Sequence, residues 1–352
     1  MLNYLSGLLQ EETAVKEIKG NTVLFSAQGT DADYAKIRKD VGIFPFTFVS
    51  YFKITGDDAD ETLDALLTKS VQYLNYGQNR MCYFLSEAGE IEAYITIYKN
   101  DDHFIIELFN WDAQNVSTIL QSANISYEKL DYSCILFEGV AAADFITEEL
   151  GLPVDYFVYQ SHQDCELFDQ SFVVSRTGYT GEYGYKFIGE SASIKQIWSQ
   201  LLPKYKDKLV GYSAFELCQY EIKQPFWELP YLTVSDNIFE VDYHWLVDFK
   251  KDIDYIGKSA LYETRSEQVE HKIIGAVSET ETKIGESVLL EEEPIGTVLD
   301  SRFSIGLNKY ISMLFVNKDY AHANIQLLTE SKQAITTASA PYVYPSSWSA
   351  NR

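Results

Sequence analysis

The sequence has few basic residues for its length. Its 352 residues include 28 lysines and arginines against 52 aspartates and glutamates, which gives a net charge of -24. A chain with this charge repels phosphate backbones and anionic lipid headgroups. It also lacks an apolar run of about 18 residues, the length that a membrane-spanning helix requires. We therefore expect neither nucleic acid nor a membrane as a partner.

Cysteine is also scarce, and the four cysteines are far apart in the sequence. Without a Cys-x-x-Cys pair, neither a zinc ribbon nor a thioredoxin-like site is supported, and the five histidines show no metal-ligand spacing. No Gly-x-Gly-x-x-Gly fingerprint, phosphate-binding loop or Gly-x-Ser-x-Gly elbow occurs. The spacing of cysteine and histidine therefore predicts no bound metal. The N-terminus has no basic segment followed by a long apolar stretch, so we expect no signal peptide and a cytoplasmic location.

Aromatic residues are abundant, with 26 tyrosines and 20 phenylalanines. Hydrophobic residues make up 46% of the chain and charged residues 23%, proportions typical of a globular protein with a buried core. The length predicts two or three domains. We expect most aromatic side chains in the core, although such side chains also form pockets for flat rings.

The spacing of apolar residues predicts mixed α and β structure. Leucine and valine recur at helical spacing across residues 63–71. Strand-like residues 81–85 and 91–98 flank a short turn, which predicts a hairpin. From residue 272 onward, short β-rich runs alternate with turn residues, a pattern typical of a small antiparallel barrel or sandwich. The sequence therefore predicts an α+β fold that ends in a small antiparallel β-barrel.

The most informative segment is the glycine-rich run Ser175–Phe187, which reads Ser-Arg-Thr-Gly-Tyr-Thr-Gly-Glu-Tyr-Gly-Tyr-Lys-Phe. Three glycines within seven positions indicate a turn with unusual backbone angles or close packing. Apolar residues 172–174 and 185–187 predict a strand on each side of the turn. Polar side chains are therefore expected where two strands meet.

This run resembles the signature of the glycine-cleavage aminomethyltransferase (T-protein) family, whose members bind tetrahydrofolate. Five other segments are similar to family segments and follow in the same order: 41–44, 54–59, 248–261, 294–298 and 340–342. On these segments the chain is identified as a diverged member of the folate-binding superfamily. The resemblance implies a three-domain cloverleaf around a central channel. The domains are expected at residues 1–50 plus 135–265, 51–134, and 266–352, the last being the barrel.

The resemblance implies an acid on the hairpin. The family carries an Asp-Asp pair there, and the matching residues are Glu92 and Ala93. Transfer of a one-carbon unit to or from folate N5 requires proton movement at that nitrogen, for which a carboxyl with a raised pKa is suited. We predict Glu92 as the catalytic acid, with Tyr83 as a nearby hydrogen-bonding phenol.

The resemblance also implies a set of cofactor-binding positions. The family carries a glutamate seven residues after the signature tyrosine, and the matching position is Lys186. An ammonium donates hydrogen bonds, whereas a carboxylate accepts two of them from the aminopyrimidine edge of a pterin. In the helix near residue 215 both family arginines are replaced, and a family glutamate is kept. The predicted cofactor-binding residues are Tyr179, Glu182, Lys186, Gln219, Glu221 and Trp227.

The resemblance leaves two functions open. The first is a tetrahydrofolate-dependent transferase that moves a methyl or aminomethyl group from a small molecule. An amine donor requires the acid, whereas an already activated donor such as a sulfonium requires mainly positioning, as in a folate-dependent demethylase of the same superfamily. The second is a non-catalytic folate-fold binding or accessory protein. In either case the net negative charge argues against an acidic lipoyl carrier protein as a partner.

Overall fold

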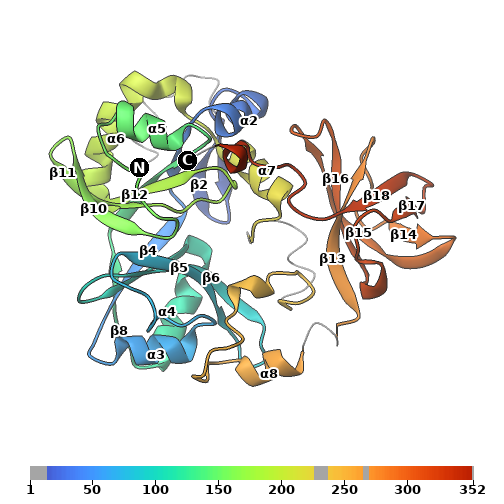
Figure 1. Ribbon diagram of the computed structural model, residues 1–352, viewed down its shortest axis with the longest axis horizontal. Helices are drawn as coiled ribbons and strands as arrows, with labels where there is room; N and C mark the ends of the chain where they lie inside the picture. The colour runs from blue at the N-terminus through green and yellow to red at the C-terminus, as the bar shows by residue number, and fades with distance from the viewer. Residues whose placement is uncertain (1–13, 226–236, 265–268, 351–352) are drawn as a thin grey trace.

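The computed structural model describes residues 14–225, 237–264 and 269–350. Two five-stranded sheets and one closed barrel meet around a common centre (Figure 1). Helices are present beside both sheets, so the α+β fold and the C-terminal antiparallel barrel are as predicted. The domain bounds given above stay a prediction.

The first sheet combines an early strand with four later ones. Its order is β10 (His162–Leu167), β11 (Gln170–Ser175), β12 (Gly184–Glu190), β9 (Tyr132–Glu138) and β3 (Gly42–Phe46). Phe168 and Asp169 both have positive φ between β10 and β11, as the tightest hairpin turns require. Apolar residues of α5 (Ala142–Glu148) and α6 (Ser191–Tyr205) share a hydrophobic core with one face of this sheet.

The second sheet contains the predicted hairpin. Its order is β5 (Gln78–Leu85), β6 (Ile91–Lys99), β7 (Phe104–Phe109), β4 (Val49–Thr55) and β8 (Ser126–Leu130). Alternate residues of β6 face opposite ways, as the pleat of a strand dictates. Ala93, Ile95 and Ile97 pack with α3 (Ala59–Leu66) and α4 (Ala113–Ser122), whereas Tyr94 and Tyr98 belong to the central core.

The barrel closes in a single circuit of antiparallel strands. Their order is β13 (His271–Ser278), β16 (Lys309–Asn317), β15 (Glu293–Ser304), β14 (Ser287–Leu290), β17 (Gln326–Thr329) and β18 (Ala334–Ala338). Its interior is a separate small core that includes Val288, Val298 and Leu314. Closure leaves no unpaired sheet edge, so the barrel is complete without help from the other units.

Several shorter elements connect the three units. Strands β1 (Ala14–Ile18) and β2 (Asn21–Ser26) form a ribbon. Helix α7 (Tyr212–Ile222) packs against β2 and also against α2 (Thr30–Lys39). The remaining elements are α8 (Lys258–Glu263) and short 3-10 helices, among them η1 (Asn110–Asp112) and η6 (Ser346–Ser349). Among the described residues, no helix is both long and apolar enough to cross a membrane.

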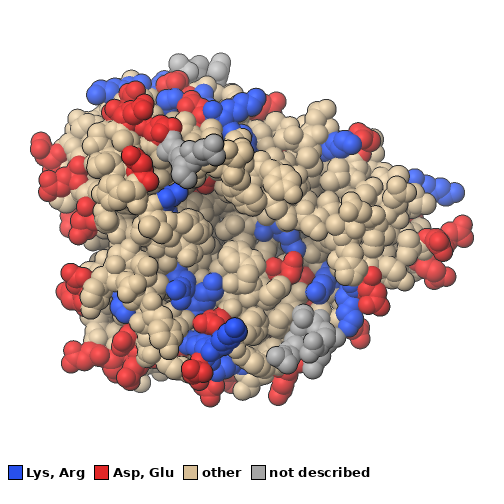
Figure 2. Space-filling view, viewed as in Figure 1, with Lys and Arg blue, Asp and Glu red and all other residues tan. Residues whose placement is uncertain are grey.

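The largest hydrophobic core lies where the three units meet. It takes residues from both sheets, from α7 and from the barrel strands β13 and β16. Tyrosine and phenylalanine side chains are numerous in it, which accounts for much of the aromatic content of the sequence. On the face shown in Figure 2, the surface is hollowed near its centre, and charged side chains gather toward its outer edge.

Candidate functional site

The glycine-rich run forms the turn between β11 and β12, as predicted, and a buried carboxylate binds the backbone of this turn. Glu138, at the end of β9, accepts hydrogen bonds from the backbone N–H groups of Tyr179 (2.6 Å) and Thr180 (2.9 Å), and from the Thr180 hydroxyl. Gly178 must be glycine, because a Cβ there would lie 2.9 Å from both Glu138 and Gly184. Burial raises the pKa of the Glu138 carboxyl to about 7, although these hydrogen bonds and Lys186 oppose the shift.

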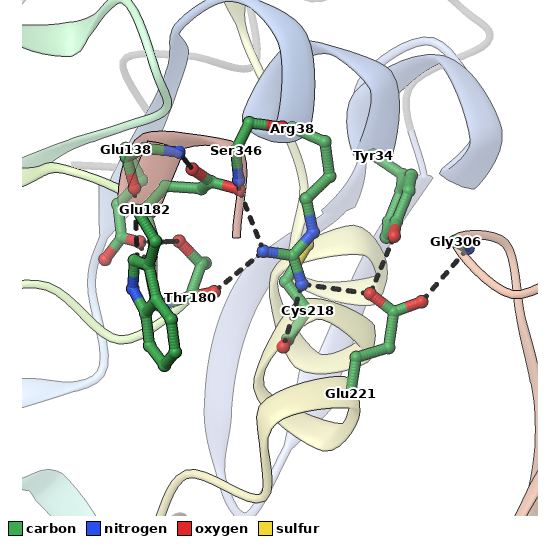
Figure 3. A network of polar contacts seen from close by, with 12 residues as sticks. Tyr34, Arg38, Glu138, Thr180, Glu182, Cys218, Glu221, Gly306 and Ser346 are labelled. Atoms are coloured by element: carbon green, nitrogen blue, oxygen red, sulfur yellow. Dashed lines mark hydrogen bonds and ion pairs between the residues drawn. The ribbon is translucent and has the colours of Figure 1, made fainter. Parts of the chain in front are cut away.

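The predicted cofactor-binding residues Glu182 and Glu221 belong to a buried polar network (Figure 3). Arg38 of α2 lies between them and forms an ion pair with each, at 3.2 Å and 2.9 Å. Glu182 also accepts the backbone N–H groups of Ser346 (2.9 Å) and Ser347 (2.8 Å) at the start of η6. The carboxylate of Glu182 therefore ties the glycine-rich turn to the C-terminal segment.

Glu221 ties the same network to the barrel. Its carboxylate accepts hydrogen bonds from Tyr34 (2.7 Å) on one oxygen and from Ser304 (2.6 Å) and the Gly306 N–H (3.2 Å) on the other. Together with Arg38, these donors use the acceptor capacity of the group. Glu182 and Glu221 thus bind protein groups that join the units of the fold.

A further buried ion pair, separate from the Arg38 network, connects the two sheets at the centre. Lys186 of β12 donates to the carboxylate of Glu107 on β7, and both side chains are almost fully buried. Tyr179 donates to the same oxygen of Glu107 at 2.9 Å. Tyr51 (3.0 Å) and Tyr98 (3.1 Å) donate to the other oxygen. Glu107 therefore has two donors on each oxygen, which satisfies a carboxylate.

Aromatic rings fill the space around this pair. The Tyr179 ring stacks on Phe46 with centroids 5.4 Å apart, and Phe109 stacks on Trp111 at 4.8 Å. The space beside Glu107 is bounded by Val49, Tyr94, Thr96, Glu107, Leu108, Phe109 and Tyr179, and a water molecule cannot enter it. A pterin ring therefore does not fit the centre with the side chains in these positions.

A cavity of about 580 Å³ lies next to the filled centre. Its wall includes Gly178, Gly181, Glu182 and Gly184 of the glycine-rich turn, and rings of Tyr243, Trp245 and Trp348. Tyr94 lies near both the cavity and the centre, because it interacts with Gln224 of the cavity wall and also lines the space beside Glu107. The volume is within the range of about 300–1,000 Å³ that is usual for small-molecule sites.

Two cations, Arg176 and Lys223, and a second acid, Asp242, also contribute to the wall of this cavity. Arg176 lies over the Tyr183 ring, 5.7 Å from its centroid. Lys223 and Asp242 both have a positive backbone φ, 52° and 65°, which residues other than glycine rarely adopt. Burial lowers the pKa of Lys223 to about 8, and the charge of Asp242 opposes this shift.

The structure separates the two predicted catalytic residues. Glu92 lies at an irregularity of the hairpin, where Phe84 pairs with Ala93 and Leu85 pairs with Ile91, so Glu92 has no cross-strand partner. Its carboxylate accepts a hydrogen bond of 2.6 Å from Asn115 of α4, and it is absent from the cavity wall. Tyr83 instead packs against Tyr94 in the central core. The catalytic role of Glu92 stays a prediction.

Polar atoms of two predicted residues are buried without a described partner. The Tyr83 hydroxyl and both side-chain polar atoms of Gln219 make no hydrogen bond with the residues that the structure describes. Buried groups of this kind are usually satisfied by water, a ligand or another part of the chain. Trp227, the remaining predicted residue, lies outside the described residues.

Sequence reasoning missed Arg38, Glu107 and Glu138. Glu107 was detectable, because it is the one charged residue in the otherwise apolar strand Phe104–Phe109. Its partner was not, because Lys186 lies 79 residues further along the chain. Within the described residues, no group of three His, Cys, Asp or Glu side chains is arranged as a metal site.

Comparison with known proteins assigns the fold to a family. The family model described as the GCVT N-terminal domain matches residues 21–251, about two thirds of the sequence. The chain belongs to this family. Among curated relatives of this GCVT-family chain, the aminomethyltransferase of Thermotoga petrophila is 28% identical over 301 residues, with 80% of each chain covered. That of Prochlorococcus marinus (strain NATL1A) is 24% identical over 344 residues, covering 90% of this chain and 91% of the relative.

A solved structure supports the same assignment at the level of the fold. The glycine cleavage system aminomethyltransferase T from Bartonella henselae matches with a TM-score of 0.83 over 95% of each chain, at 19% sequence identity. The resemblance read from the sequence is therefore confirmed for the family and for the fold.

Proposed function

We propose that this GCVT-family protein is a tetrahydrofolate-dependent one-carbon transferase that acts on a small molecule. The observation that carries the proposal is the place of the 580 Å³ cavity, because the glycine-rich turn on which the family resemblance rests forms part of its wall. Aminomethyltransferases are also the curated relatives that cover most of the chain.

The cavity suits a ligand with aromatic rings and an anionic tail. Tyr243, Trp245 and Trp348 offer faces on which a ring stacks. Arg176 and Lys223 would attract the carboxylates of a glutamyl tail, and the guanidinium has donors beyond the one it gives to the Phe157 carbonyl. When bound there, the folate would supply the nitrogen that accepts the one-carbon unit.

The geometry favours a donor that is already activated. Glu92 binds Asn115 and does not line the cavity, and Glu182 is occupied by Arg38 and η6. Asp242 is the remaining acid of the cavity wall among the described residues. A donor such as a sulfonium needs orientation more than protonation, so methyl transfer asks less of these side chains than aminomethyl transfer does.

A specific observation favours a second candidate, a non-catalytic binding or accessory protein of the same family. The centre is filled by aromatic side chains and by the Lys186–Glu107 pair. A ligand held only in the outer cavity would be bound without reaching the acid-bearing sheet. Retained binding without turnover is the expected behaviour of such a protein.

Titration with tetrahydrofolate under anaerobic conditions tests both candidates. We expect binding by calorimetry, with affinity about five-fold weaker in Arg176→Gln and in Lys223→Gln, as loss of one partly exposed charge contact implies. Lys204→Gln, an exposed lysine of α6 outside the cavity wall, is the matched control and should bind as the wild type does.

Turnover then separates the two candidates. Incubation with tetrahydrofolate and an amine, methyl-ether or sulfonium donor is followed by mass spectrometry of the folate product. A methylated or methylene folate supports the transferase. Binding without product for any donor supports the non-catalytic protein, and the absence of binding removes both.

A further inference from the structure

The centre of the molecule contains a carboxylate, Glu107, in a position to bind a ligand. A lysine of the protein, Lys186, forms an ion pair with this carboxylate. Glu107 lies in the middle of β7, where it bounds the filled central space together with Tyr94. Lys186 reaches it from the other sheet, and its ammonium also donates to the Tyr179 hydroxyl at 2.9 Å. The pair therefore joins two sheets by charge as well as by packing.

We propose that Glu107 is a ligand-binding carboxylate and that Lys186 is its internal competitor. The proposal rests on the proposed function, because the ligand class is a reduced pterin such as the ring of tetrahydrofolate. The aminopyrimidine edge of that ring presents two N–H donors, and a carboxylate is the group that accepts both. Lys186 now supplies a donor where that edge would bind.

Hydrogen bonds from its own sheet fix the Glu107 carboxylate in one orientation, so it is preorganised as an acceptor. Tyr51 is its direct cross-strand neighbour, and Tyr51 and Tyr98 fix one oxygen from the same sheet. Among the described residues, the other oxygen accepts only from Lys186, which lies on β12 of the first sheet, and from Tyr179, which lies in the turn before β12. A ligand can therefore replace these two donors without disturbing the oxygen that the second sheet holds.

The surroundings match a flat ring. Tyr94, Phe109 and Tyr179 bound the space beside Glu107, and the Tyr179 ring already stacks on Phe46. Removal of the Lys186 side chain beyond Cβ would create space next to these rings. Tyr94, which bounds this space, also interacts with Gln224 of the outer cavity wall, so the tail of the ligand would extend toward Arg176 and Lys223.

Binding of 5-formyl-tetrahydrofolate, a chemically stable reduced folate, to the full-length protein tests this assignment by calorimetry. We expect Lys186→Ala to bind at least about ten-fold more tightly than wild type, because the competitor is gone and Glu107 lacks one donor. The matched control is Lys186→Ala/Glu107→Gln, which has the same space without the carboxylate and should gain no affinity. Lys186→Arg, which keeps a donor and fills the space, should also gain none.

Lys186→Ser covers the event that the alanine variant does not fold, because the serine hydroxyl can still donate to Glu107. A gain of affinity in a folded Lys186→Ala or Lys186→Ser variant that disappears with Glu107→Gln supports the proposal. An equal gain with Glu107→Gln, or no gain in either folded variant, overturns it. Wild-type protein that binds no folate would remove the proposed function, yet the gain in the variants would still be measurable.

Discussion

At the scale of single residues, the buried carboxylates explain why the glycine-rich turn is well defined. Glu138 accepts two backbone N–H groups of the turn, and Glu182 connects it to η6. Each carboxylate replaces water as the acceptor for these N–H donors and holds them in fixed positions, so the turn has one favoured conformation. Among the described residues, Glu138 forms no ion pair with an arginine. Burial is therefore the dominant influence on the Glu138 pKa and raises it.

The pH dependence of stability should reveal Glu138. Its pKa is about 7 in the folded protein against 4.5 as the ordinary value, so the folded state binds more protons between these pH values. Its contribution to stability therefore falls as the pH rises from about 4.5 to about 7, by about 3 kcal/mol in total. Urea unfolding should show that the free energy of unfolding of Glu138→Gln increases relative to that of wild type as the pH rises over this range. A difference that does not change with pH would contradict the assignment.

His162 makes the comparison with a variant necessary. Burial lowers the pKa of His162 to about 4, so its contribution to stability rises with pH between about 4 and 6.5. The slopes from Glu138 and His162 have opposite signs and overlap. The profile of the wild type alone would therefore hide both contributions.

At the scale of elements, the C-terminal end of α7 places a lysine in the cavity wall in a strained backbone conformation. The residue that caps this helix is Lys223, in the left-handed conformation with φ 52° and ψ 46°. Glycine is the residue usually found at such a position, because it has no Cβ to be strained. The strain is compensated in part by a hydrogen bond of 2.9 Å from the Lys223 ammonium to the Ile273 carbonyl.

Lys223→Gly should separate stability from binding. We expect stability equal to wild type or higher by up to about 1 kcal/mol, since relief of strain outweighs or balances the lost hydrogen bond. Affinity for tetrahydrofolate should fall about five-fold, because a cation is removed from the cavity wall. Chemical unfolding and calorimetry measure the two effects. Lys332→Gly, at an exposed left-handed position with φ 65°, is the control and should leave affinity unchanged. Unchanged affinity in Lys223→Gly would contradict the role assigned to its charge.

At the scale of the whole molecule, three units are joined by one shared core and by buried charge. The central core takes side chains from both sheets and the barrel, while Arg38, Glu182 and Glu221 join α2, the turn, η6 and the barrel. Removing one partner of such a buried network leaves charges unpaired, so the junction between the units is expected to lose stability.

The net charge of -24 gives a prediction at the same scale. Like charges on a compact surface repel, and salt screens that repulsion over a Debye length of about 10 Å at 0.1 M. Thermal unfolding should therefore shift to higher temperature when NaCl is raised from about 0.05 M to about 0.5 M. The buried ion pairs are screened much less than exposed charges, so they should not reverse the trend. A lower melting temperature in the higher salt would show that exposed ion pairs outweigh the repulsion.

Local patterns in the sequence were sufficient for much of the fold. The alternation over 81–85 and 91–98 gives β5 and β6, and the short β-rich runs after residue 272 form the barrel. The helical spacing over 63–71 is correct only for residues 63–66, because α3 ends at Leu66. The glycines of the Ser175–Phe187 run gave both the turn and the family. These features depend on neighbours in the chain, so the sequence contains the information for them.

The site residues depend on contacts between distant parts of the chain. Glu182 and Glu221 were expected at a cofactor, but Arg38, 144 and 183 residues away, is bound to them. Glu92 was predicted as the catalytic acid, and its contact with Asn115, beside an irregularity in the register of the hairpin, could not be read from the sequence. Counting along the sequence could not detect these partners.

The sequence by itself determined the periodicities, the glycine-rich turn and the family, because each is encoded by residues a few positions apart. Only the tertiary structure decided which carboxylates are already satisfied and whether space remains for a ring. Lys186 illustrates the difference, since its identity is plain in the sequence, but its effect depends on Glu107 in another sheet. A buried charge acquires its role from the partners that folding brings within hydrogen-bond distance.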